Sequence, residues 1–151
     1  MIDVFGENPL ADFKLNSKEG CRANGDYFIC YLNTIEGLKT KCKNLHWAAP
    51  KKNIHIYLDE FLEEMSEFQD SIAEGYMGIT GRIAPNVITG KPSNALNATD
   101  FIDEVLNATL DFYSKLPEEI IYNGIKSESD DFIQNINKYK YLFSLCDVRP
   151  Y

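Results

Sequence analysis

The stretch IAPNVITGKPSNALN, residues 83–97, decides how the rest of this chain is expected to fold. It is rich in Pro, Gly, Asn, Ser and Thr, which are typical of loops, and it separates two regions that show helical periodicity. Fifteen residues are many more than a tight turn between two neighbouring helices needs. We therefore expect a crossover that runs along the molecule and joins two pairs of helices.

Two amphipathic helices are predicted before this connection. Apolar residues recur at steps of three and four over residues 24–47, and again from residue 54 to about residue 80. Asn24 or Asp26 is expected near the cap of the first helix, and Pro50 interrupts the pattern between the two helices. Three glycines close to residue 80 weaken the end of the second helix.

Two further helices are predicted after the connection. The third covers residues 102–116, with Thr99 or Asp100 as its N-cap. A polar turn, NGIKSESDD at residues 123–131, is expected to follow, and the fourth helix then covers residues 132–146. No strand pattern competes strongly with the helical periodicity.

The predicted fold is therefore all-α: a ferritin-like four-helix bundle with a long crossover between the second and third helices. The 151 residues suit one domain with its own core. We expect the bundle domain to cover residues 24–147. Residues 1–23 then form an N-terminal extension and residues 148–151 a C-terminal tail.

Composition and charge narrow the class of partner. The chain has 15 Lys and Arg against 23 Asp and Glu, a formal net charge of -8, so cations are more natural partners than nucleic acid or anionic lipid. No apolar run approaches the roughly 20 residues that span a bilayer, and the first twenty residues lack a signal-peptide pattern. We expect a cytoplasmic protein with no nucleic-acid or membrane partner. Its four cysteines, none in a C-x-x-C pair, are then expected to be reduced thiols.

Metal-ligating residue types lie along one stripe of the second helix. At about 100° per residue, His55, Asp59, Asp70 and Glu74 fall within an arc of about 100°. Asp59 and Asp70 are nevertheless about 16 Å apart along the helix axis, which is too far for one metal ion with bonds of about 2 Å. A single chain therefore offers two half-sites, His55 with Asp59 and Asp70 with Glu74.

Two copies of the chain would complete these half-sites. Antiparallel pairing of the second helix with its copy, about a two-fold axis near Glu64 and Met65, brings each half-site opposite the other kind, which makes two equivalent sites about 22 Å apart. His46 can join the His55 half across the Pro50 break. Two imidazoles and three carboxylates suit iron(II) or another first-row divalent ion. The chain has no Glu-x-x-His motif, which argues against an intrachain di-iron site.

These residues resemble a known signature. The order His46-Trp47, then His55-x-x-x-Asp59, then Asp70-x-x-x-Glu74 is similar to the ferroxidase signature of the Dps family of mini-ferritins. The resemblance continues more weakly in INKYKYLFSL, residues 136–145, which is similar to that family's Lys-rich, aromatic final helix. It covers about residues 25–146.

The resemblance implies a four-helix subunit that assembles into a hollow shell, often a dodecamer. Members of that family bind iron(II), oxidise it with hydrogen peroxide or oxygen, and store ferric oxide inside the shell. It implies ligands or near-ligands from one subunit at His46, His55 and Asp59, and ligands from its neighbour at Asp70 and Glu74. Trp47 would be the nearby aromatic side chain that quenches oxidising equivalents.

The chain also departs from the family, and other interpretations stay open. The interval between His46 and His55 is shorter than the family usually has, Gly75 stands where the family has arginine, and there is no lysine-rich N-terminal tail, so DNA binding is not carried over. Taken singly, His46 can complement a helix dipole, and His55 with Asp59 can be a surface pair. The alternatives are a ferritin-like structural or assembly protein without redox activity, and an adaptor bundle that binds a protein partner.

Overall fold

The computed structural model of the chain describes residues 26–146, and the regular structure in this part of the chain is helical. The elements are α2 (Asp26–Ala48), α3 (Lys52–Thr80), α4 (Ala98–Ser114), the 3-10 helix η2 (Ile120–Tyr122) and α5 (Asn123–Ser144). No strand occurs within the described residues. The predicted all-α class is therefore confirmed for this part of the chain.

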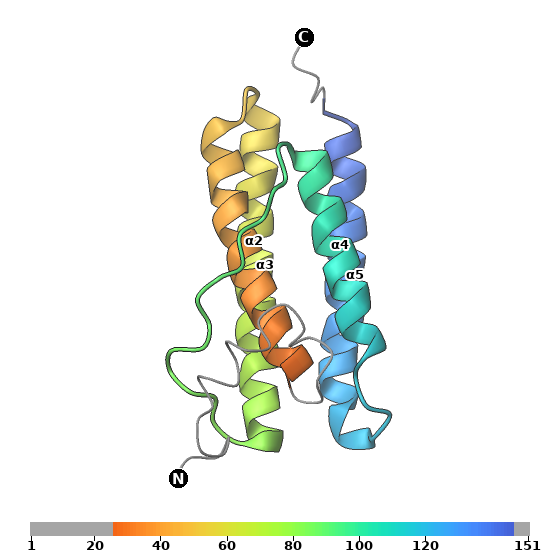
Figure 1. The fold of residues 1–151 in the computed structure, drawn as a ribbon. Helices are drawn as coiled ribbons and strands as arrows, with labels where there is room; N and C mark the ends of the chain where they lie inside the picture. The colour runs from red at the N-terminus through yellow and green to blue at the C-terminus, as the bar shows by residue number, and fades with distance from the viewer. Residues whose placement is uncertain (1–25, 147–151) are drawn as a thin grey trace.

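The four long helices pack side by side around one core (Figure 1). α2 packs against α3 and α4, and α5 packs against the same two helices. The connection between α3 and α4 returns along α2 to the opposite end of the bundle, so α3 and α4 run in the same direction (Figure 1). The short junction between α2 and α3 and the end of α5 lie together at one end of the molecule.

Aromatic side chains fill much of the core. The rings of Phe68 and Phe132 stack with centroids 4.1 Å apart and planes inclined by 11°. Phe132 also stacks on Phe61, at 5.8 Å and 13°. Since Phe61 and Phe68 belong to α3 and Phe132 to α5, these stacks join the two halves of the bundle.

The long connection is anchored to α2 by the buried side chain of Asn33. The Asn33 amide nitrogen donates to the carbonyl oxygens of Val87, at 2.9 Å, and Ile29, at 3.2 Å. The Asn33 side-chain oxygen accepts from the backbone N–H groups of Thr89, at 2.8 Å, and Gly90, at 3.1 Å. One side chain thus satisfies four backbone groups where the connection crosses the helix.

Gly37, one turn further along α2, allows the closest approach of the connection. A Cβ atom built on Gly37 would lie only 1.6 Å from the carbonyl oxygen of Lys91. The backbone N–H of Lys91 in turn donates to the carbonyl oxygen of Asn33 at 2.9 Å. Only a residue without a side chain fits here.

The start of α5 corrects one prediction. Residues 123–131 were expected to form a polar turn, but they are the first turns of α5, which begins at Asn123. Ile125 and Ser129 are buried and extend the apolar stripe of α5 back from Phe132, and the Ser129 hydroxyl donates to the carbonyl oxygen of Ile125 at 2.8 Å. Tertiary packing therefore outweighs the low helix propensity of this polar segment.

The other helix limits agree with the predictions to within a few residues, although the predicted caps do not all hold. α4 begins one residue after Asn97, whose side chain accepts from the backbone N–H of Asp100 at 2.8 Å, so the predicted caps Thr99 and Asp100 were wrong. α3 ends at Thr80 and is followed by its C-cap Gly81, which has φ +104°. The predicted cap Asn24, the N-terminal extension (residues 1–23) and the C-terminal tail (residues 148–151) lie outside the described residues.

The cysteines differ from the prediction at one position. Cys30 is disulfide-bonded, so the expectation of a reduced thiol was wrong for this residue. Cys42 and Cys146 are free and buried. Among the described helices, none combines the length and the apolar character that crossing a bilayer requires.

Candidate metal centre

The junction between α2 and α3 brings the two histidines into direct contact. Their imidazole rings stack with centroids 3.8 Å apart and planes inclined by 18°. Nδ1 of His46 bonds to the carbonyl oxygen of His55 at 2.7 Å, and Nδ1 of His55 bonds to the carbonyl oxygen of His46 at 2.7 Å. Because a carbonyl oxygen only accepts, both Nδ1 atoms carry a proton, and in its neutral form each ring then has its lone pair on Nε2.

This contact fits a metal site in one respect and conflicts with it in another. A histidine that binds a metal commonly donates its other ring N–H to a backbone carbonyl, as both His46 and His55 do here. The lone pair on Nε2, however, lies in the plane of its ring. Since the two planes are nearly parallel, the rings cannot direct both lone pairs at one ion while they are stacked.

The predicted carboxylate ligands lie on the solvent-facing side of α3. Asp59, Asp70 and Glu74 are all exposed, opposite the buried stripe of this helix. Within residues 26–146, none of the three makes a hydrogen bond or ion pair. These carboxylates are therefore available to groups outside the chain.

The predicted ligands do not form one site within the chain. Among the described residues, no three His, Cys, Asp or Glu side chains come together in a group that could hold a metal ion. His46 and His55 meet at one end of α3, next to Asp59, while Asp70 and Glu74 lie further along the helix. The joining of these half-sites by a second copy stays a prediction.

Acidic residues greatly outnumber basic residues on α3. α3 carries seven carboxylates and a single lysine. Burial, with a further contribution from the charge of Asp59, raises the pKa of the Cys42 thiol to about 12. The Cys42 sulfur donates to the carbonyl oxygen of Leu58 at 3.2 Å, which places this thiol between α2 and α3, one turn from the histidines. The charge of Asp59 therefore acts on a thiol that is buried between two helices.

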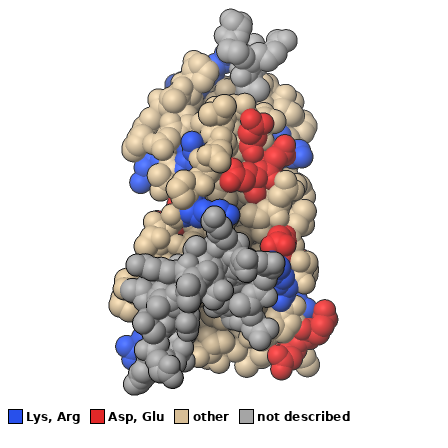
Figure 2. Space-filling model, viewed as in Figure 1, with Lys and Arg blue, Asp and Glu red and all other residues tan. Residues whose placement is uncertain are grey.

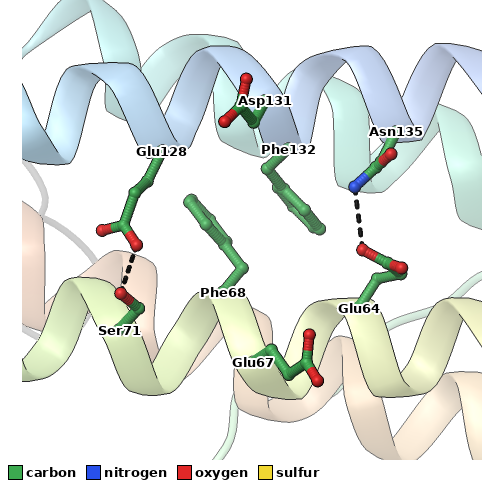
Figure 3. Close-up of a pocket in the computed structure, with 8 residues that line it drawn as sticks. All are labelled: Glu64, Glu67, Phe68, Ser71, Glu128, Asp131, Phe132 and Asn135. Carbon is green, nitrogen blue, oxygen red and sulfur yellow. Dashed lines mark hydrogen bonds between the residues drawn. The ribbon is translucent and has the colours of Figure 1, made fainter.

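A second acidic feature is an open pocket of about 260 Å³ between α3 and α5 (Figure 3). Ser71 and Asn135 donate to two of its carboxylates, Glu128 and Glu64, the latter at 2.8 Å. The stacked rings of Phe68 and Phe132 lie between these two hydrogen-bonded pairs (Figure 3). Glu67 and Asp131 complete the acidic lining.

This pocket was not predicted from the sequence. Its α5 side comes from Glu128 and Asp131, which were assigned to a turn and therefore had no helical face. Ile125, Ser129 and Phe132 have helical spacing, and this pattern could have predicted that Glu128 and Asp131 lie on the same helix. Close by, the hydroxyl of Tyr139 donates to Glu60 at 3.2 Å. Burial is the main cause that raises the pKa of this phenol, and the hydrogen bond to Glu60 is the second.

Acidic side chains also gather on the face that carries α4. Figure 2 shows them over the first half of this helix, which contains Asp100, Asp103 and Glu104. Lys140 of α5 pairs with Asp103 at 3.0 Å. Ser93, just before α4, donates to Glu104 at 2.7 Å. These acids are thus partly satisfied by neighbours within the chain, unlike the predicted ligands on α3.

Comparisons with known proteins add one match. The model of DUF5856, a family of unknown function, matches residues 46–143. The match begins at His46 and includes all five predicted ligand residues. No curated protein and no solved structure matches the chain.

Proposed function

We propose that this chain, which belongs to the DUF5856 family, is a ferritin-like, Dps-like iron-binding protein whose metal sites form between two subunits. Each site takes His55 and Asp59 from one subunit and Asp70 and Glu74 from the other, with His46 beside His55. The substrate is iron(II), and the oxidant is hydrogen peroxide or oxygen. Each iron(II) ion gives up one electron, and hydrogen peroxide takes two and is reduced to water.

One observation carries the proposal: His55, Asp59, Asp70 and Glu74 lie on the exposed side of α3, at both ends of one stripe, and the three carboxylates have no side-chain partner within the described residues. An imidazole and carboxylates are a donor set that suits iron(II). Two-fold pairing of α3 would supply every site with ligands from both half-sites. The excess of carboxylates over lysine on α3 also favours a cationic substrate.

Iron oxidation tests the chemistry. Iron(II) is added to the purified protein in air, and the ferric product is followed by its absorbance. We expect the double variant His55→Ala/Asp70→Ala to lose the accelerated oxidation that the wild type shows. Glu119→Gln, which removes one exposed carboxylate that is not part of α3, is the matched control and should keep the wild-type rate. A wild-type rate no faster than that of the double variant would refute ferroxidase activity.

Mixing single variants tests whether a site is shared between subunits. His55→Ala and Asp70→Ala should each be inactive alone, because each damages both sites of a symmetric dimer. After the two are unfolded and refolded together, a mixed dimer has one intact site and one site that lacks both residues. Random mixing should therefore restore about a quarter of the wild-type activity. No recovery would mean that each site uses residues of one subunit only.

Sedimentation tests the assembly. We expect at least a dimer, and a shell of about twelve subunits if the resemblance to Dps extends to assembly. A stable monomer at micromolar concentration would remove the intersubunit site altogether. An oligomer without iron oxidation would instead support the alternative, a ferritin-like assembly protein without redox activity, which the nearly parallel histidine rings favour.

A further inference from the structure

We infer that His46 is a positioning residue: it holds the imidazole of His55 in place for metal binding and does not bind the same ion itself. The inference rests on the proposed function, and it differs from the ligand set that the sequence predicts. Its basis is the reciprocal contact of the two residues across the α2–α3 junction.

The geometry of the stack allows one ligand per ion. A ligating imidazole nitrogen lies about 2 Å from the metal, and its lone pair points along the ring plane. The two rings lie face to face, with centroids 3.8 Å apart and planes inclined by only 18°. An ion within reach of both rings would sit between their faces, where neither lone pair points. At most one of the two histidines therefore binds a given ion while the stack holds.

The surroundings select His55 as that ligand. His55 is exposed and lies on the same helix as Asp59, one turn away. His46 is half-buried, and the nearest acidic residue on its own helix is Glu36, ten residues or about 15 Å earlier. The carboxylates that would share the ion thus accompany His55.

The contacts of His46 orient this ligand. The backbone carbonyl of His46 accepts the Nδ1–H of His55, which leaves the lone pair of His55 on Nε2. The ring of His46 covers one face of the His55 ring, and its own Nδ1–H is bonded to the His55 carbonyl oxygen. His46 therefore restrains the ring of His55 by a stack and the backbone of His55 by a hydrogen bond.

Matched substitutions separate a ligand from a positioning residue. Asparagine places its amide N–H where Nδ1 of histidine was, but it has no atom at the place of Nε2. His46→Asn and His55→Asn thus each keep the hydrogen bond to the other residue's carbonyl oxygen, and each lose the distal nitrogen and the ring stack. His46→Ala and His55→Ala remove the hydrogen bond as well. Because the contacts are reciprocal, the two Ala variants lose equivalent hydrogen bonds and all four variants lose the same ring stack, and a difference between matching variants in metal affinity reports on the metal ligand.

The readout is the affinity of the full-length protein for Co²⁺, measured by calorimetry and by visible absorbance of the bound ion. We expect His46→Ala to weaken binding by about 10- to 100-fold, as is usual when a partner of a ligand is lost, and His46→Asn to recover most of that loss. We expect His55→Asn to bind as poorly as His55→Ala. Fluorescence of Trp47, the single Trp of the chain, and far-UV circular dichroism check that each variant keeps its junction and its helices.

Each outcome decides the question. Equal losses in His46→Asn and His55→Asn would overturn the inference and make both histidines ligands. Wild-type affinity in His46→Ala would overturn it as well, because nothing would then depend on positioning. If the wild type itself binds neither Co²⁺ nor iron(II), the proposed function fails and this inference falls with it, a result distinct from the other two.

Discussion

The two connections at the ends of α3 are held by similar contacts that lie in different surroundings. At the start of α3, two imidazoles and two backbone carbonyls bind each other at an exposed junction. At its end, the long connection is held by the buried Asn33 and by the close approach of Lys91 to Gly37. Buried polar contacts are costly to break because the groups left behind lose water as well as partners. We therefore expect the contacts of the connection to contribute more to the free energy of unfolding than those of the junction. The residues of the junction can then serve metal binding at little cost in stability.

The strongest test of this contrast is Gly37→Ala. The new methyl group would lie 1.6 Å from the carbonyl oxygen of Lys91, so the connection has to move away from α2. We expect a loss of about 3 kcal/mol or more in the free energy of unfolding, measured by urea denaturation.

The control is Gly78→Ala, which lies in α3 with open space around it. Alanine favours a helix by up to about 1 kcal/mol over glycine, so this variant should be as stable as the wild type or more so. If Gly37→Ala were as stable as Gly78→Ala, the connection would not be in close contact with α2 at Gly37.

Asn33→Ala should have the next largest effect. It leaves two backbone N–H groups and the carbonyl of Val87 without their partner where the connection crosses α2. We expect the free energy of unfolding to fall by about 2–4 kcal/mol. Asn137→Ala, an exposed asparagine of α5, should change stability by less than about 0.5 kcal/mol. Similar values for both variants would contradict the role given to Asn33.

The buried thiol of Cys42, one turn before His46 of the junction, should make the stability of the protein depend on pH in alkaline solution. The pKa of the Cys42 thiol rises from an ordinary value of 9.0 in the unfolded chain to about 12 in the folded protein, because of burial first and of Asp59 second. The unfolded state thus loses this proton at lower pH, so stability is complete below about pH 9 and falls as pH rises toward 12.

At pH 10 we expect a loss of about 1 kcal/mol from this group. Urea denaturation at several pH values, for the wild type and Cys42→Ala, measures it. Between pH 9 and pH 11 the wild type should lose stability more steeply than the variant. Other groups, such as the buried tyrosines, titrate in both proteins and cancel in the difference. Parallel curves would mean that the thiol is more hydrated than its burial indicates.

His46→Ala should have the smallest effect on stability. It removes one hydrogen bond and a ring stack at an exposed junction, so we expect a loss of about 1 kcal/mol or less. Urea denaturation of His46→Ala, His55→Ala and the double variant gives the coupling energy between the two side chains. A loss as large as that of Asn33→Ala would mean that the junction, too, is built for stability.

Much of the fold follows from local patterns. Apolar residues at steps of three and four predict α2, α3 and α4 to within a few residues, since helical period is a property of neighbouring positions. The polar segment at the start of α5 was misassigned, because its helical state depends on the burial of Ile125 and Ser129 against other helices. The N-cap of α4 is Asn97 and not Thr99 or Asp100, for a similar reason. Several neighbouring polar residues are suitable N-caps, and the backbone conformation determines which of them takes that position.

The candidate site divides along the same line. Residue identities and helix geometry were enough to place four metal-ligating residues on one stripe of α3 and to show that their spacing is too long for one ion. The packing of the helices was needed to show that His46 and His55 stack face to face, and that one pocket is lined by Glu64, Glu67, Glu128 and Asp131. Both arrangements depend on contacts between side chains of different helices, and the periodicity of a single helix does not predict such contacts.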